Sequence, residues 1–288
     1  MDLSRPYQAT RRDVPFLRHA GVEYLARIWA PAGGPPSGRT VVLDVHGGAW
    51  CDHDRRAGKR YNTALAEAGA VVVAIDFRTG LTHQHPAASA DVSAAVRWIR
   101  ANAESLGVDP ARVVSVGSSS GGHLAMLSAL RPNEPEHRGG ELLVGGQWVN
   151  LDDDDGSVLA VSPLWPPLDP LARHAYASNL GTDHGQRLVA NTEAYFGTSG
   201  AMDEANVTAV IQGGRHTHLP PVWLVQAEYD RNVPVSIIGE FASAYGMADG
   251  EFSVSLYHEV PHGFGHADGA ESDRFTADLL EWVASFEK

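Results

Sequence analysis

Short apolar runs alternate with amphipathic stretches along most of the chain, and this pattern predicts strands that alternate with helices. The predicted strands are residues 24–29, 40–45, 70–75, 113–116, 158–161, 222–227 and 252–257. The predicted helices are residues 58–68, 87–106, 122–130 and 271–286. Strands that are apolar almost throughout are typical of a parallel sheet buried on both faces. The sequence therefore predicts an α/β fold with a mostly parallel central sheet and helices on both faces.

Two segments interrupt this alternation. Residues 132–155 are polar and glycine-rich and end in the acidic run 152–155, which predicts a solvated loop; metal binding by the aspartates is the alternative. Residues 163–218 contain prolines, aromatic residues and two predicted helices. Because no repeat or linker divides the chain, we expect one domain over residues 1–288, in which residues 163–218 form a lid above the sheet. Four aromatic residues of this segment could line a substrate pocket or form the core of the lid: Trp165, Tyr176, Tyr195 and Phe196.

Charge and cysteine content narrow the range of functions. The formal net charge is −13, which argues against nucleic acid or an anionic membrane surface as a partner, because both are negatively charged. The one cysteine, Cys51, excludes an intramolecular disulfide and a cysteine-rich zinc site. The start of the chain is polar, and no window approaches the roughly 18 apolar residues of a membrane-spanning helix. We therefore expect a cytoplasmic protein without a membrane partner.

A cluster of serines and glycines lies between a predicted strand and a predicted helix. Residues 117–121 read Gly-Ser-Ser-Ser-Gly and match the G-x-S-x-G pattern, in which a sharp strand-to-helix turn exposes the central serine. Centring the pattern on Ser119 places glycine two residues before and two residues after it, where a Cβ would collide with neighbouring backbone. Ser119 is therefore the predicted nucleophile, and Ser120 is the alternative.

A serine nucleophile needs a general base, and the base needs an acid that orients it. In this type of fold the expected chain order is serine, then acid, then histidine. Asp230 follows the predicted strand 222–227, and His262 follows the predicted strand 252–257, so both should lie at the same sheet edge as Ser119. The alternatives are Glu228 for the acid, and His258 and His266 for the base.

A histidine-glycine-glycine sequence follows the predicted strand 40–45. Acyl transfer passes through a tetrahedral intermediate, whose negative oxygen is stabilised by backbone N–H groups. The expected donors of this oxyanion hole are the amides of Gly48 and Ala49, together with the amide of Ser120 after the nucleophile.

Taken together, these segments resemble the α/β-hydrolases of the hormone-sensitive-lipase-like and acetyl-esterase type. The matching pieces are 44–50 (DVHGGAW), 74–78 (AIDFR), 85–86 (HP) with Asp91, 115–122 (SVGSSSGG), 227–234 (AEYDRNVP) and 260–264 (VPHGF). The resemblance implies the same residues, namely Ser119, Asp230 and His262, as a catalytic triad. Ala49 stands where lipase-like members have a third glycine, and this form of the motif also resembles carbohydrate esterases, feruloyl esterases and aryl-formamide hydrolases.

The resemblance implies a serine carboxylic-ester hydrolase that acts on small or aryl esters through an acyl-enzyme. The alternatives are an amide hydrolase of the aryl-formamidase type and a non-catalytic binding protein on the same fold. The expected partner is a small-molecule ester or amide, with no cofactor and no metal ion. A homodimer through the C-terminal helix or an edge strand is one option for assembly.

Overall fold

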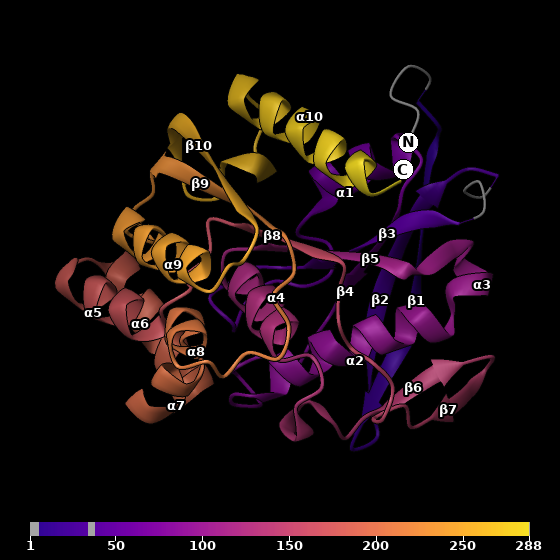
Figure 1. The fold of residues 1–288 in the computed structure, drawn as a ribbon, viewed down its shortest axis with the longest axis horizontal. Coiled ribbons are helices and arrows are strands. Elements are labelled where there is room, and N and C mark those ends of the chain that lie inside the picture. The colour runs from indigo at the N-terminus through magenta and orange to yellow at the C-terminus, as the bar shows by residue number, and fades with distance from the viewer. Residues whose placement is uncertain (1–5, 34–37, 288) are drawn as a thin grey trace.

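The computed structural model describes residues 6–33 and 38–287, and its centre is a mostly parallel sheet (Figure 1). In these residues the sheet has ten strands in the order β10-β9-β8-β5-β3-β4-β2-β1-β6-β7. Neighbours from β10 to β4 are parallel, whereas β4, β2, β1, β6 and β7 pair antiparallel. The strands are β1 Ala9–His19, β2 Val22–Pro31, β3 Arg39–Val45, β4 Val71–Ile75, β5 Val108–Ser118, β6 Glu141–Val144, β7 Gln147–Val149, β8 Ala160–Leu164, β9 Val222–Tyr229 and β10 Phe252–Pro261. The predicted α/β class is therefore confirmed.

Helices cover both faces of the sheet, as Figure 1 shows for α1 and α10 on one side and α2 and α4 on the other. The helices are α1 Lys59–Glu67, α2 Ala87–Ala101, α3 Ala103–Leu106, α4 Ser120–Leu130, α5 Pro170–Asn179, α6 Asp183–Phe196, α7 Ser199–Glu204, α8 Val207–Gln212, α9 Val235–Met247 and α10 Ala270–Ala284. Short 3-10 turns are η1 Pro135–His137, η2 Phe264–His266 and η3 Ser285–Glu287. No helix within these two ranges is both long and apolar enough to cross a membrane.

The core consists of two apolar layers, one on each face of the sheet. Strand β3 contributes to both, because successive side chains of a strand point to opposite faces. Val41 and Leu43 pack in the layer with α2, α4 and α9, whereas Val42 packs in the layer with α1 and α10. This burial on both faces explains why the parallel strands contain so few polar residues.

The structure differs from the predicted elements in several places. The helix predicted over 87–106 is two helices, because the side-chain amide of Asn102 donates to the carbonyl oxygens of Trp98 (2.9 Å) and Leu143 (3.2 Å) at the break between them. Strand β1 was missed because its first half is exposed and polar. The hairpin β6–β7 was also missed, although Gly145 and Gly146 both adopt the positive φ angles that such a two-residue turn requires. Helix α9 was not predicted, and residues 163–218 contain four helices instead of two.

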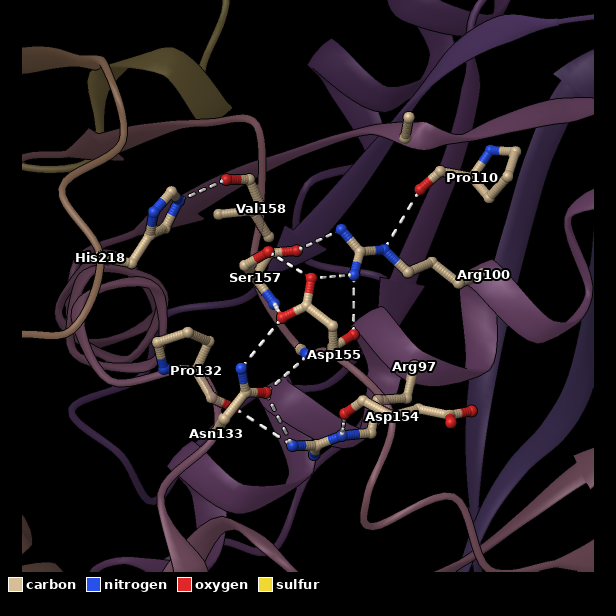
Figure 2. A network of polar contacts seen from close by, with 12 residues as sticks. Arg97, Arg100, Pro110, Pro132, Asn133, Asp154, Asp155, Ser157, Val158 and His218 are labelled. Atoms are coloured by element: carbon tan, nitrogen blue, oxygen red, sulfur yellow. Dashed lines mark hydrogen bonds and ion pairs between the residues drawn. The ribbon is translucent and has the colours of Figure 1, made fainter.

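The acidic run 152–155 lies in a loop whose residues 153–155 are exposed, as predicted, and hydrogen bonds also anchor it to the molecule. The carboxylate of Asp155 accepts hydrogen bonds from Arg100 (2.6 Å), Asn133 (3.0 Å) and Ser157 (2.6 Å), which ties the loop to α2 (Figure 2). Burial raises the pKa of Asp155, but the hydrogen bonds from Ser157, Asn133 and Arg100 outweigh this effect and hold the pKa below its usual range. Within residues 6–33 and 38–287, no group of three His, Cys, Asp or Glu side chains could hold a metal ion.

One acidic side chain, Asp44 on β3, lies inside the core layer beside α1. Its exposed fraction is 1%, and its carboxylate accepts hydrogen bonds from the Tyr61 hydroxyl (2.9 Å) and the Asn62 amide (2.6 Å). No Lys, Arg or His side chain in the described ranges lies within ion-pair distance of it. Burial therefore raises the pKa of Asp44 to about 6, despite the hydrogen bonds from Asn62 and Tyr61.

Asp44 should make stability depend on pH. A pKa of about 6 in the folded state, against an ordinary value of 3.8, means that folding favours the protonated carboxyl. Its contribution is fully present below pH 3.8 and is lost as the pH rises through about 6, by on the order of 3 kcal/mol. We expect Asp44→Asn to gain stability relative to the wild type between about pH 4 and pH 7, measured as the difference in Tm at several pH values. The exposed control Asp203→Asn should show no such trend, and a pH-independent difference for Asp44→Asn would contradict the shift.

Candidate active site

Ser119 lies at the sharp turn between β5 and α4. Its backbone has φ 51° and ψ −124°, a conformation that L-residues rarely adopt and that often marks functional sites. The neighbouring side chains Ser118 and Ser120 are buried (1% and 0% exposed), whereas Ser119 is only partly buried. Of the three consecutive serines, Ser119 therefore presents its hydroxyl to the adjacent pocket.

Glycines make this turn sterically feasible. A Cβ on Gly117 would lie 2.4 Å from the carbonyl oxygen of Gly121, and a Cβ on Gly121 would lie 2.0 Å from the carbonyl oxygen of Val45. Cβ atoms do not approach backbone oxygens so closely. The chain can therefore turn from β5 into α4 only because Gly117 lacks a side chain, and the start of α4 can touch the end of β3 only because Gly121 lacks one.

The Ser119 hydroxyl begins a chain of hydrogen bonds. Nε2 of His262 lies 2.9 Å from Oγ of Ser119, and Nδ1 of His262 lies 2.7 Å from Oδ2 of Asp230. The other carboxylate oxygen of Asp230 accepts from the backbone N–H groups of Asn232 (2.7 Å) and Val233 (2.9 Å). These two bonds orient the carboxylate, and only 2% of the Asp230 side chain is exposed. A hydroxyl, an imidazole and a carboxylate in this order form the arrangement in which the imidazole accepts the proton of the hydroxyl.

Among the described residues, neither the alternative acid nor the alternative bases form a hydrogen bond to the Ser119 hydroxyl. Glu228 accepts a hydrogen bond from the backbone N–H of Glu259 (2.8 Å) and lies 3.4 Å from Nδ1 of His258. The side chains of Glu228 and His258 are 38% and 66% exposed, so they pair with each other at the surface. His266 borders the pocket, and its ring meets that of Trp165 edge to face with centroids 5.8 Å apart.

The loop after β3 borders the pocket next to Ser119. Gly48 (φ 111°) and Ala49 (φ 49°) turn the backbone sharply, and both border the pocket beside Ser119. In the described part of the chain, the N–H groups of these two residues have no hydrogen-bond acceptor. The N–H of Ser120 begins α4 and so lacks an acceptor within the helix. The Ser120 hydroxyl accepts from the backbone N–H of Trp50 (3.0 Å), which ties this loop to the turn that carries Ser119.

The pocket beside Ser119 has a volume of about 280 Å³. Ser119 and His262 at the sheet edge line the pocket. Segment 163–218 contributes six further lining residues, namely Trp165, Arg173, His184, Arg187, Leu188 and Asn191. Of the four aromatic residues considered in this segment, only Trp165 borders the pocket. Tyr195 and Phe196 pack instead against Trp50, with ring centroids 6.0 and 5.0 Å away.

Burial raises the pKa of Cys51 to about 11, so its thiol is protonated at neutral pH.

The turn should not tolerate a side chain at Gly121. The added methyl of Gly121→Ala would lie 2.0 Å from the Val45 oxygen and 2.3 Å from the His46 oxygen, so β3 and α4 must separate. We expect a loss of about 1–3 kcal/mol or more in the free energy of unfolding, measured by urea denaturation. Gly239→Ala in α9 is the matched control, because nothing lies within 4 Å of its Cβ position and alanine favours a helix by about 1 kcal/mol. Equal stability of the two variants would contradict the close approach.

Known proteins are similar to this chain in both sequence and fold. The BD-FAE family model matches residues 28–244, which is well over half of the chain. Esterase LipC of Mycobacterium tuberculosis is 29% identical over 253 residues, which cover 86% of this chain and 59% of that protein. Lipase 2 of a Moraxella species is 31% identical over 204 residues, which cover 66% of this chain and 47% of that protein. The chain thus spans only about half the length of these relatives.

Solved structures agree with this relationship. A hyperthermophilic esterase from Pyrobaculum calidifontis superposes with a TM-score of 0.75 at 21% identity, covering 99% of this chain and 85% of that one. The propionate-bound esterase of Thermogutta terrifontis superposes with a TM-score of 0.70 at 25% identity, covering 96% and 93%. The predicted resemblance is confirmed, and the chain belongs to the BD-FAE family within the α/β-hydrolases.

Proposed function

We propose that the protein is a serine carboxylic-ester hydrolase that works through an acyl-enzyme. The observation that carries the proposal is the hydrogen-bonded chain from Ser119 through His262 to Asp230 at the wall of a pocket. Relatives named esterase or carboxylic ester hydrolase support the same activity. A small-molecule ester is the proposed substrate.

In the proposed first half-reaction, Oγ of Ser119 attacks the carbonyl carbon of the ester while its proton passes to Nε2 of His262. The ester carbonyl oxygen becomes negatively charged and accepts hydrogen bonds from the N–H groups of Gly48, Ala49 and Ser120. The imidazolium of His262 is stabilised by the carboxylate of Asp230. Collapse of the tetrahedral intermediate breaks the bond to the alcohol, which takes the proton from His262 and leaves an acyl-Ser119 ester.

In the second half-reaction, water attacks the carbonyl carbon of the acyl-enzyme. His262 accepts a proton from this water, and the same three N–H groups hold the new negative oxygen. Breaking the bond to Ser119 releases the carboxylic acid and returns the proton to Oγ. The preformed orientation of the imidazole by Asp230 lowers the cost of both proton transfers, because the ring does not have to reorganise.

We also propose that residues 163–218 act as the lid expected from the sequence, within a single domain. The support is that several of their side chains border the pocket opposite Ser119. A cytoplasmic location and a homodimer stay predictions from the sequence.

The triad proposal predicts a large and selective loss of activity. Ser119→Ala and His262→Gln should each lower kcat on p-nitrophenyl acetate by roughly 10⁴-fold or more, because each removes a group that acts on the reacting atoms. His258→Gln is the matched control and should retain wild-type turnover, since His258 pairs with Glu228 at the surface. Melting temperatures should confirm that all three variants fold, and unchanged turnover in Ser119→Ala would exclude this serine as the nucleophile.

The substrate class is tested by comparing an ester with an amide. We expect a higher kcat/KM on p-nitrophenyl acetate than on N-formylkynurenine. The reverse order would assign the site to the aryl-formamidase type of amide hydrolase, and a folded wild-type protein with neither activity would point to a binding protein.

The lid proposal predicts a change in chain-length preference. Leu188 on α6 borders the pocket, so Leu188→Ala should enlarge it and raise kcat/KM for p-nitrophenyl hexanoate relative to the acetate by about 10-fold, the order expected for a few methylenes in an apolar site. Val189→Ala on the same helix is the control, because Val189 lies outside this pocket. An equal hexanoate-to-acetate ratio of kcat/KM for both variants would show that the Leu188 side chain does not limit the length of the bound acyl chain.

A further inference from the structure

A buried arginine borders the candidate active-site pocket. Arg173 on α5 is 2% exposed and is one of the residues that line the pocket beside Ser119. Its Nη1 donates to the backbone oxygen of Leu188 (2.9 Å) and to the hydroxyl of Thr192. Its guanidinium carbon lies 5.3 Å from the ring centroid of Trp50. These contacts hold one corner of the guanidinium against α6 and the aromatic ring.

The other edge of this guanidinium is not used. Nε of Arg173 is buried without a hydrogen-bond acceptor, and among the described residues Nη2 has no acceptor either. No carboxylate in the described ranges lies within 4.0 Å of Arg173. Burial lowers the pKa of Arg173 only to about 10, so the side chain is cationic at neutral pH. A buried charge with unpaired donors is costly, and a bound anion would offset that cost.

A second buried arginine shows how the protein satisfies such a group when no ligand is involved. Arg97 is also 2% exposed, and it too lacks a carboxylate partner in the described ranges. Its Nε donates to the backbone oxygen of Asp154 (2.7 Å), its Nη1 to that of His137 (3.3 Å) and its Nη2 to that of Pro132 (3.2 Å). Figure 2 shows this guanidinium between Asp154 and Pro132. Every nitrogen of Arg97 thus has a protein acceptor, which is not so for Arg173.

The charge of the pocket also differs from that of the whole chain. The chain has a net charge of −13, but the Arg and Asp residues that line the pocket are Arg173, Arg187 and Asp52. The carboxylate of Asp52 accepts a hydrogen bond from the Asn191 amide (2.9 Å) and does not contact Arg173. The two arginines of the lining thus outnumber its one aspartate, and the carboxylate of Asp230 behind His262 also acts on the charge of Arg173.

We infer that Arg173 binds a carboxylate of the substrate, so that the preferred esters of this protein carry a carboxylate in addition to the ester group. Nη2 of Arg173 has no acceptor among the described residues and can donate to a carboxylate oxygen, and Nε lies buried on the same edge of the planar guanidinium, which matches the two oxygens of a carboxylate once the ligand displaces the groups that cover Nε. This inference rests on the proposed esterase function and names its substrate class. The ester carbonyl lies at Ser119, and the carboxylate reaches across the pocket to α5.

The test compares esters that differ mainly in one charge. The first pair is 4-acetoxybenzoate and its methyl ester, which places the carboxylate on the alcohol side. The second pair is mono-(4-nitrophenyl) adipate and 4-nitrophenyl hexanoate, which places it on the acyl side. For each pair we define the selectivity as kcat/KM of the anionic ester divided by kcat/KM of the neutral ester.

Arg173→Met should lower this selectivity in at least one pair by roughly 10- to 100-fold, mainly through KM, as expected for the loss of a charged hydrogen-bonded contact. Arg173→Lys keeps the charge but not the planar edge and should give an intermediate value. Arg97→Met is the matched control, because it removes a buried arginine outside the pocket; it should lose stability without a change in selectivity. Selectivity that is the same in the wild type, Arg173→Met and Arg173→Lys for both pairs would overturn the inference.

Binding separates this inference from the proposed activity. When 4-acetoxybenzoate and mono-(4-nitrophenyl) adipate are titrated into Ser119→Ala, at least one of them should bind more tightly than its neutral counterpart. In the double variant Ser119→Ala/Arg173→Met this difference in affinity should disappear. Such binding without any turnover by the wild type would refute the esterase proposal but keep the carboxylate site. Turnover of neutral and anionic esters with no dependence on Arg173 would refute the carboxylate site but keep the esterase.

Discussion

The contact between the turn at Ser119 and the end of β3 is the constraint on which the rest of the site depends. Gly121 lies against the backbone oxygens of Val45 and His46, where a methyl group would come within 2.0 and 2.3 Å. A Cβ on Gly47 would likewise lie 2.9 Å from the backbone oxygen of Ser118. This approach brings the Ser119 hydroxyl and the free N–H groups of Gly48 and Ala49 to one pocket. Without it, Ser119 and these N–H groups, which belong to two different loops, would not border the same pocket.

Parallel pairing of β5, β8, β9 and β10 brings the remaining groups to the same place. Because parallel strands end at the same edge of a sheet, the segments after β9 and β10 both face the end of β5. Asp230 and His262 occupy these segments, although 143 residues separate His262 from Ser119. The two amide hydrogen bonds to Asp230 then orient its carboxylate toward the imidazole. The positions of Ser119, Asp230 and His262 therefore depend mainly on the order of the parallel strands and on backbone hydrogen bonds.

Three buried arginines illustrate how the protein accommodates charge away from water. Arg78 is paired with the buried carboxylate of Asp91 through Nε (2.9 Å) and Nη2 (2.7 Å), and Arg97 is surrounded by backbone oxygens. Arg173 has only part of its guanidinium satisfied, and it is the one of the three that borders the pocket. Of these three arginines, only Arg173 combines a buried Nε without an acceptor with a place on the pocket lining.

The sequence by itself determined the fold class, because apolar strands and amphipathic helices are local patterns with fixed periods. It also pointed to Ser119, Asp230 and His262, since each follows a recognisable strand and the glycines around Ser119 have a steric purpose. The sequence favoured His262 over His258 because His262 lies in the loop past the strand, and the structure places His262, not His258, within hydrogen-bond distance of Ser119. The position of segment 163–218 against the pocket and the burial of Arg173 were decided by tertiary structure. A side chain's burial and its free hydrogen-bond donors depend on segments distant in sequence, so no local pattern marks Arg173 as different from Arg97.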